Sequence, residues 1–280
     1  MIRALNIVIL VFISIPLCAN EIKIQGTISD QSNKTLQYVS IGIVNKTIGT
    51  VSDINGKFEL IINKRDISDK DTLRFSMIGY ESKSFPLSEI IYHTDLKIQL
   101  NQKIVTIPEA IVTGKKLKTK IKGTKHFPVP LYVGVIDSTV QDFTLGSSIA
   151  RSLNINHENT RIENIRFFLY SNFDTTSIRI NIYSIRRRKP YKSILTEGIY
   201  TQITGKTHDW VSVDLKPYNI VVNEDIVIAI EWVGRSKNGS YLFFPLARPS
   251  AASHFYRQGC QNKWEKYPGM SCLMELTLKY

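Results

Sequence analysis

Short runs in which apolar and polar residues alternate fill the region from residue 21 to residue 100. Ile22 and Ile24, for example, are separated by Lys23, and similar runs occur at residues 38–44, 57–62, 72–76, 81–87 and 95–100. Alternation with a period of two is typical of a strand with one buried face, and no segment here keeps a helical period. The pattern predicts a β-sandwich of short strands.

A turn is predicted at Asn55-Gly56, which lies between two apolar runs. This pair favours a β-hairpin, because both central positions of the preferred turn need a positive φ. Asp53 is placed to accept backbone N–H bonds in the same turn. A calcium loop needs oxygen ligands at alternating positions, and the apolar Ile54 and the basic Lys57 do not supply them. We therefore interpret the segment as a structural turn.

A set of residues in this region is shared with a known domain. The set is Gly26, Asp30, Gly49-Thr50, Ser52-Asp53, Gly56, Phe58 and Ile78-Gly79-Tyr80. In order and spacing these residues resemble the carboxypeptidase-regulatory-like domain. The resemblance implies a transthyretin-like, seven-stranded β-sandwich over residues 20–114. Relatives of this domain in Gram-negative bacteria often form the N-terminal extension of starch-utilisation-type TonB-dependent receptors, and others precede unrelated exported domains.

The segment "IPEAIVTGKK" at residues 107–116 resembles the stretch of those receptors that the TonB protein engages, although Pro108 and Ala110 depart from its pattern. An outer-membrane transporter needs 22 strands of about 10 residues and a plug domain. Only 164 residues follow Lys116 (280 − 116). The chain therefore lacks the plug and the barrel, and residues 104–113 are predicted to form the edge of the first sandwich. Binding of TonB in trans is a weaker alternative.

The second half of the chain again has a strand pattern. Ile178, Ile180 and Ile182 alternate with polar residues, which predicts a strand with one wet face. Residues 226–230 are continuously apolar, as in a strand covered on both sides. Eight to ten such strands predict a jelly-roll-like β-sandwich over residues 127–280. The last strand reaches the chain end, so a truncation there is expected to be costly.

Basic residues are concentrated in two places in a chain with a formal charge of +12. Six lysines fall within residues 115–125, and residues 115–126 are predicted to be a solvated linker, with a basic arm that touches an acidic envelope surface as the alternative. Residues 186–190, "RRRKP", are predicted to be an exposed basic loop that ends in a turn proline. Acidic glycans or lipid headgroups are the partners expected for such charge, and nucleic acid is not.

The N-terminus has the layout of a secretory signal peptide, with Arg3, an apolar run from residue 4 to residue 17, and the small residue Ala19. The prediction is a signal peptide at residues 1–19 and a protein exported to the periplasm, the outer membrane or the medium. Lipidation at Cys18 and an uncleaved anchor are the alternatives. Export places Cys260 and Cys272 in an oxidising compartment, where a disulfide between them is predicted and a free buried pair is the alternative.

Catalytic motifs are not evident. The five histidines form neither His-x-His nor His-Glu-x-x-His, no metal-ligand spacing occurs, and no cofactor is predicted. His208-Asp209 is adjacent along a strand and so points to opposite faces. Glu224, Asp225 and Glu231 could supply paired carboxylates for a polysaccharide hydrolase, which is the alternative function.

Flat aromatic side chains are the best candidates for binding. Trp210, Trp232, Tyr256 and Trp264 could each stack on a sugar ring, although tryptophans in a sandwich also serve as core. The sequence therefore predicts a non-catalytic, exported binding or assembly protein of the cell envelope that recognises a glycan or an envelope partner.

Overall fold

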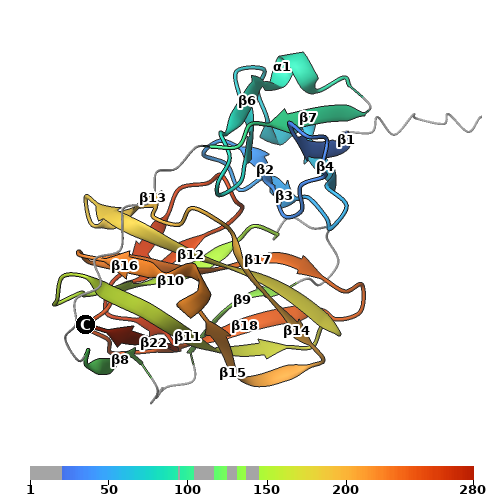
Figure 1. The fold of residues 1–280 in the computed structure, drawn as a ribbon. Coiled ribbons are helices and arrows are strands. Elements are labelled where there is room, and N and C mark those ends of the chain that lie inside the picture. Colours follow the sequence, from blue (N-terminus) through green and yellow to red (C-terminus); the bar gives the residue numbers. More distant parts are fainter. Residues whose placement is uncertain (1–20, 94, 104–116, 125–130, 137–144) are drawn as a thin grey trace, which may run out of the picture.

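The computed structural model describes residues 21–93, 95–103, 117–124, 131–136 and 145–280. It forms an N-terminal unit (residues 21–103) and a larger C-terminal unit (residues 117–280), which lie above and below one another in Figure 1. Nearly all regular structure in the described part is strand, so the all-β prediction is confirmed. None of the helices in these residues is long and apolar enough to span a membrane.

The N-terminal unit is the predicted sandwich of seven strands in two sheets. One sheet has the order β4-β1-β7 and the other has the order β3-β2-β5-β6. The elements are β1 (Glu21–Asp30), β2 (Ser40–Ile43), β3 (Gly49–Val51), β4 (Lys57–Asn63), the 3₁₀ turn η1 (Lys64–Asp66), β5 (Thr72–Ser76), β6 (Lys83–Pro86), α1 (Leu87–Ile90) and β7 (Leu96–Leu100). Alternating residues of these strands, such as Ile24 and Ile28 of β1, are buried between the sheets beside Phe58 and Phe75.

The turn at residues 53–56 forms as predicted, but it does not make a hairpin. The Asp53 carboxylate accepts hydrogen bonds from the backbone N–H groups of Asn55 and Lys57, both at 2.8 Å. Of the two central hairpin positions, only Gly56 has a positive φ (74°). The strands that flank the turn, β3 and β4, belong to different sheets, so the turn carries the chain across the sandwich.

The C-terminal unit is a second β-sandwich, as expected. Its strands are β8 (Thr119–Gly123), β9 (Leu131–Ile136), β10 (Ser148–Leu153), β11 (Thr160–Ser171), β12 (Thr175–Arg186), β13 (Lys189–Ser193), β14 (Ile199–Thr204), β15 (Thr207–Asp214), β16 (Ile220–Val222), β17 (Ile226–Arg235), β18 (Tyr241–Ala247), β19 (His254–Arg257), β20 (Glu265–Tyr267), β21 (Ser271–Cys272) and β22 (Met274–Lys279), with a 3₁₀ turn η2 (Lys216–Tyr218).

Two sheets enclose the core of this unit. One has the order β13-β12-β17-β10-β19-β20 with β14 beside β12, and the other has the order β21-β18-β11-β22-β8 with β9, β15 and β16 attached. Inward side chains of both sheets form one apolar cluster, which includes Phe167, Trp232 and Leu276. Val51 of the N-terminal unit belongs to the same cluster, so the two units share part of a core.

The lysine-rich segment is not wholly a linker. Residues 119–123 form β8, which pairs antiparallel with β22, and the backbone of Lys118 exchanges hydrogen bonds with Tyr280 at 2.7 and 3.0 Å. The C-terminal unit thus begins before residue 119 rather than at residue 127. Lysines on an edge strand oppose pairing with another chain. Residues 104–116, including the predicted edge strand, and residues 125–126 lie outside the described residues.

Burial corrects one strand prediction and supports another. Val227 and Ala229 of β17 are both fully buried, so this strand is covered on both faces as predicted. The face of β12 predicted to be wet carries Arg179 and Asn181, which are only 3% and 2% exposed. The N-terminal unit lies against this face, and this contact between distant parts of the chain is invisible to a local pattern.

A buried histidine of the C-terminal unit makes its stability sensitive to acid. Neither ring nitrogen of His254 on β19 has a hydrogen-bond partner among the described residues, and burial lowers its pKa to about 4. Because the unfolded chain then binds the proton more readily, the stability that this residue contributes is complete above its ordinary pKa, about 6.5, and is lost as the pH falls to about 4.

We expect His254→Leu to lose less stability than the unchanged protein between pH 7.5 and pH 4, by roughly 3 kcal/mol. Urea denaturation of both proteins at the two pH values measures the difference. Carboxylates also titrate in this range, but they do so in both proteins and cancel in the comparison. Equal losses in the two proteins would contradict the expectation.

Candidate functional site

A buried polar network joins the two units. The guanidinium of Arg179 on β12 donates to both carboxylate oxygens of Glu231 on β17, at 2.7 and 3.1 Å. It also donates to the carbonyl oxygen of Tyr38 at 2.7 Å and to the hydroxyl of Ser40. Asn181 donates to the same carboxylate at 2.7 Å. One cation of the sandwich therefore holds both a neighbouring strand and the N-terminal unit.

The electrostatics of this network follow from its burial. Glu231 is 1% exposed, and burial alone raises its pKa. The positive charges of Arg179 and Arg257 and the bond from Asn181 outweigh burial, so the pKa of Glu231 is lowered overall. Burial opposes the charge of Arg179 in the same way, and Glu231 more than compensates, so the pKa of Arg179 is raised. Arg179 and Glu231 are therefore both ionised, and their hydrogen bonds help to hold the two units together.

A loop at residues 259–262 completes the contact. Cys260 donates its thiol hydrogen to the carbonyl oxygen of Ile41 at 3.1 Å, and the N–H of Asn45 bonds the carbonyl oxygen of Gln261 at 3.0 Å. A Cβ atom built on Gly42 or Gly49 would lie 3.1 or 3.2 Å from the Cys260 sulfur. Glycine at these positions therefore allows the backbone of β2 and β3 to approach the loop at residues 259–262.

The predicted disulfide is absent, because Cys260 and Cys272 are both free and buried. Cys260 points at the N-terminal unit, whereas Cys272 belongs to the core of the sandwich. Burial raises the pKa of Cys260 to about 12 and that of Cys272 to about 11, so both are protonated thiols at neutral pH. The spacing of two cysteines could not reveal that their side chains face different partners.

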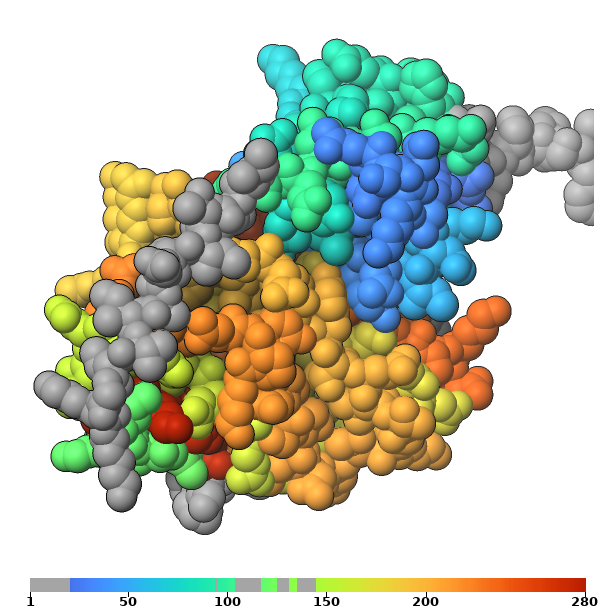
Figure 2. All heavy atoms as spheres, viewed as in Figure 1, coloured from blue at the N-terminus to red at the C-terminus, as the bar shows by residue number. Residues whose placement is uncertain are grey.

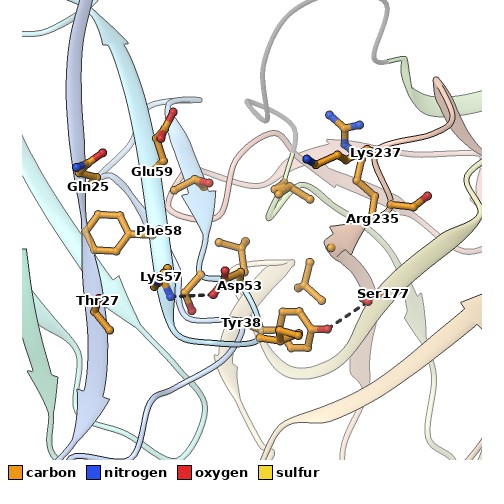
Figure 3. Close-up of a pocket in the computed structure, with 18 of the residues that line it drawn as sticks. Gln25, Thr27, Tyr38, Asp53, Lys57, Phe58, Glu59, Ser177, Arg235 and Lys237 are labelled. Atoms are coloured by element: carbon orange, nitrogen blue, oxygen red, sulfur yellow. Dashed lines mark hydrogen bonds between the residues drawn. The ribbon is translucent and has the colours of Figure 1, made fainter.

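A cleft of about 850 Å³ lies beside the network, between the two units. Figure 3 shows Gln25, Thr27, Phe58 and Glu59 on one side of it, Arg235 and Lys237 on the other, and the Tyr38–Ser177 hydrogen bond below them in this view. Two of its three carboxylates already have partners: Asp53 holds its turn, and Glu59 pairs with Lys23 at 2.7 Å. The third, Asp95, is exposed. Neither histidine nor cysteine occurs among the described residues of its lining.

A partly exposed group of aromatic rings lies on the other sheet of the C-terminal unit. We call it the aromatic face; its members are Tyr132 of β9, Phe168 and Tyr170 of β11, Trp210 of β15, and Tyr241 and Phe243 of β18. These strands occupy the lower half of Figure 1. The residues come together because the strands are neighbours: Phe168 lies opposite Trp210, and Tyr170 lies opposite Phe243.

Ring contacts hold the aromatic face in a fixed arrangement. Tyr170 lies 5.4 Å from Tyr132 and 5.2 Å from Phe168, and Phe168 lies 5.7 Å from Trp210. These centroid separations lie in the range of favourable aromatic pairs. None of the six rings is buried, and Tyr132 is 44% exposed. The rings thus contact one another across the sheet face, and each keeps part of its surface accessible to solvent.

Polar groups border the aromatic face. The Arg166 guanidinium lies 5.1 Å from the Trp210 ring, and its side chain is 43% exposed although it pairs with Glu275 at 3.4 Å. His208 is exposed and lies 4.0 Å from the Tyr170 ring. Burial, together with the Tyr132 hydroxyl, raises the pKa of Tyr170, which is therefore a neutral hydrogen-bond donor at neutral pH. The border thus offers donors beside the flat rings.

The four aromatic residues predicted as a binding site do not form one. Trp210 belongs to the aromatic face, but Trp232 is 2% exposed in the core. Tyr256 packs against the same core, and Trp264 lies on the opposite sheet, with Arg257 4.6 Å from its ring. Sequence reasoning missed Phe168 and Tyr170. The run "IRFFLYS" carries aromatic side chains on both faces, so residue type alone could not show which of them point outward.

The carboxylates predicted for a hydrolase are not brought together. Glu231 lies in the middle of β17, enclosed in the network between the units, whereas Glu224 and Asp225 come just before the first residue of this strand. Asp225 accepts a bond from the N–H of Ile155 at 2.8 Å. His208 and Asp209 lie on β15 opposite Tyr170 and Leu169, which face different sides of the sheet. Within the described ranges, no group of three or more His, Cys, Asp or Glu residues could hold a metal ion.

Comparison with known families identifies the N-terminal unit. Residues 24–112 match the CarboxypepD_reg-like domain. The regulatory-like domain covers less than half of the chain, and its match extends over residues 104–112, which lie outside the described residues. Its signature residues Gly49 and Thr50 lie on β3, where they meet the Cys260 loop. In this protein these two signature residues thus lie at the contact between the regulatory-like domain and the C-terminal unit.

Two solved structures resemble the chain as a whole at low identity. The cysteine protease and lectin-like domains of Cwp84, a surface-layer-associated protein of Clostridium difficile, align with 9% identity and a TM-score of 0.36 over 87% of this chain and 59% of that one. The structure of the infectious bursal disease virus Gx strain aligns with 10% identity and a TM-score of 0.30, over 92% and 64%. The chain spans less than two thirds of either structure, and neither score establishes a common fold. No curated protein matches the chain.

Proposed function

We propose that this protein binds carbohydrate through the aromatic face of its C-terminal unit, as an exported, non-catalytic component of the cell envelope. The observation that carries the proposal is the cluster of six neighbouring aromatic side chains on one sheet face, of which Tyr132 and Tyr241 are exposed and the other four are partly exposed. Large exposed apolar patches on a folded domain mark binding sites. Flat rings with polar borders suit a sugar, which has an apolar ring face and a rim of hydroxyl groups.

The border of the aromatic face favours an acidic glycan. Arg166 and His208 present cationic or hydrogen-bonding groups next to Trp210 and Tyr170. The chain carries a formal charge of +12, which attracts polyanions over a distance. A uronic acid or another carboxylated sugar can stack on a ring while its carboxylate approaches Arg166, since guanidinium groups match carboxylates in geometry.

The regulatory-like domain would then act as a fixed spacer. It is held against the sheet that contains β12 and β17 by the polar network, the Cys260 loop and the shared core around Val51. The aromatic face lies on the other sheet, so the docked domain leaves it free. Export to the envelope is inferred from residues 1–19, and the TonB-binding alternative depends on residues 106–114; both segments lie outside the described residues.

We expect Trp210→Ala and Tyr170→Ala each to weaken glycan binding about tenfold or more, because central aromatic contacts dominate such interfaces. Calorimetry with a panel of neutral and uronic-acid oligosaccharides measures the affinity. Tyr92→Ala removes an exposed ring from the N-terminal unit and serves as the matched control, with no change expected.

Thermal unfolding of each variant separates loss of binding from loss of structure. A panel without any ligand for the unchanged protein would contradict the proposal. Binding that survives both substitutions in the aromatic face would contradict it equally, and a loss only on Trp264→Ala would move the site to the opposite sheet.

A further inference from the structure

The hairpin between β12 and β13 carries a concentration of positive charge at its tip. Arg186 pairs with Lys189 across the strands, and Arg187 and Arg188 form the two-residue turn between them. All four side chains are exposed. In Figure 2 the yellow residues of this hairpin form a projecting corner beside the N-terminal unit. The predicted basic loop is thus the tip of a β-hairpin, and Pro190 is a buried strand residue rather than a turn proline.

The backbone of this tip is strained. Arg187 and Arg188 have φ angles of 52° and 59°, so both lie in the left-handed region. Two-residue hairpin turns with positive φ at both positions strongly favour Asn-Gly, because glycine and asparagine adopt this conformation at little cost. Two arginines at these positions are therefore less favourable for the stability of the turn than Asn-Gly would be. Strain retained at an exposed position is a reason to look for a function in the side chains.

Among the described residues, three of the four tip cations make no compensating contact, whereas Arg186 donates to the Tyr191 hydroxyl at 2.9 Å. Arg187, Arg188 and Lys189 have no hydrogen bond or ion pair among the described residues. An exposed tyrosine, Tyr191, lies among them: it is 47% exposed, with the Arg186 guanidinium 4.9 Å and the Lys192 ammonium 5.4 Å from its ring. The hairpin thus combines five cations with a ring that has an apolar body and a polar tip.

We propose that this hairpin docks the protein on a membrane surface that carries anionic phosphate headgroups. Guanidinium groups bind phosphate oxygens in a bidentate manner, and clustered basic residues adsorb to anionic lipid. Tyrosine is enriched at the membrane–water interface, where one end of its ring is apolar and the other is wet. A single projecting tip presents too little area for a protein interface of ordinary size, whereas a dense layer of headgroups lets every cation find a phosphate.

The test uses the double variant Arg187→Asn/Arg188→Gly, whose sequence the turn geometry prefers. It removes two charges and keeps the hairpin, so its thermal unfolding temperature is expected to equal or exceed that of the unchanged protein. The chain from residue 20 onward is used, because it contains every described residue and lacks the apolar run at 4–17. The control Lys64→Gln/Lys70→Gln removes two exposed charges from the N-terminal unit and leaves the same net charge.

Co-sedimentation with phosphatidylcholine vesicles containing about a quarter phosphatidylglycerol is expected at low salt, with little binding to phosphatidylcholine alone. The hairpin variant should bind roughly ten to thirty times more weakly, and the control should change far less. Equal losses in the two variants, or no vesicle binding by the unchanged protein, would overturn the proposal. A third outcome is that the unchanged protein binds a soluble polyuronate or sulfated dextran but not vesicles, and that the hairpin variant loses this binding. That outcome would show that the hairpin binds a polysaccharide, and it would overturn the proposal of membrane docking.

Discussion

Glu231→Ala is expected to lower the free energy of unfolding by about 3–5 kcal/mol, because it leaves buried guanidinium groups without their carboxylate. Arg179 would lose both bonds to Glu231, and Arg257 would lose a carboxylate 3.8 Å away. The charge of Arg179 would then lie between the two packed units, where its side chain is 4% exposed and water has little access to replace the lost partner. The regulatory-like domain should loosen first, since Arg179 also binds the Tyr38 carbonyl.

Urea denaturation followed by tryptophan fluorescence measures this loss. Glu59→Gln is the matched control, because Glu59 pairs with Lys23 at the surface with side chains about half exposed (51% and 53%), and such pairs contribute about 0–1 kcal/mol. The double variant Arg179→Met/Glu231→Leu should be less destabilised than Glu231→Ala, since replacing both charges removes the cost of an unpaired one. A loss for Glu231→Ala no larger than that of the control would show that the network does not hold the units together.

Local patterns predicted the N-terminal unit well because its strands bury one face each. The alternation of Ile22 and Ile24 with Lys23 gives the same two faces in the sequence and in the structure, and residues 72–76 were predicted as a strand with the observed limits. The turn at Asp53 was also foreseen, since an Asx turn depends only on residues within it. Which sheet each flanking strand joins depends on distant pairing, and there the hairpin prediction failed.

The contact between the units could not be predicted, because its residues mimic a solvated surface. Arg179 and Asn181 alternate with isoleucines in the manner of a wet face, and only the docked domain with its Tyr38 carbonyl explains their burial. The same contact explains why Cys260 is not bonded to Cys272. A sequence shows which residues are polar, but not which of them find polar partners from the other unit.

The aromatic face illustrates a different limit. Trp210 was proposed for binding on residue type alone, and it lies in the cluster; Trp232, proposed on the same ground, is core. Neighbouring aromatics such as Phe167 and Phe168 point to opposite sides of β11, and their chemistry gives no sign of which side is covered. Only the pairing of β11 with β15 and β18 brings the outward rings together.

Ending the chain after Leu273 is expected to abolish the folding of the C-terminal unit. The deletion removes β22, which lies between β11 and β8 and carries the fully buried side chains of Met274, Leu276 and Leu278. Burying three such side chains contributes about 5–9 kcal/mol, comparable with the whole stability of a domain. The deletion also leaves β8 without its described partner and exposes the backbone of β11 over residues 161–167.

The milder variant Leu276→Ala should fold and lose about 2–5 kcal/mol, as buried leucines do when a cavity replaces them. Ile121→Ser, on the exposed side of β8, should stay within about 0.5 kcal/mol of the unchanged protein. Circular dichroism and urea denaturation of the three proteins test this order. Cooperative unfolding of the truncated chain at the normal urea concentration would contradict the placement of β22 in the middle of its sheet, and with it the assignment of residues 119–123 to the C-terminal unit.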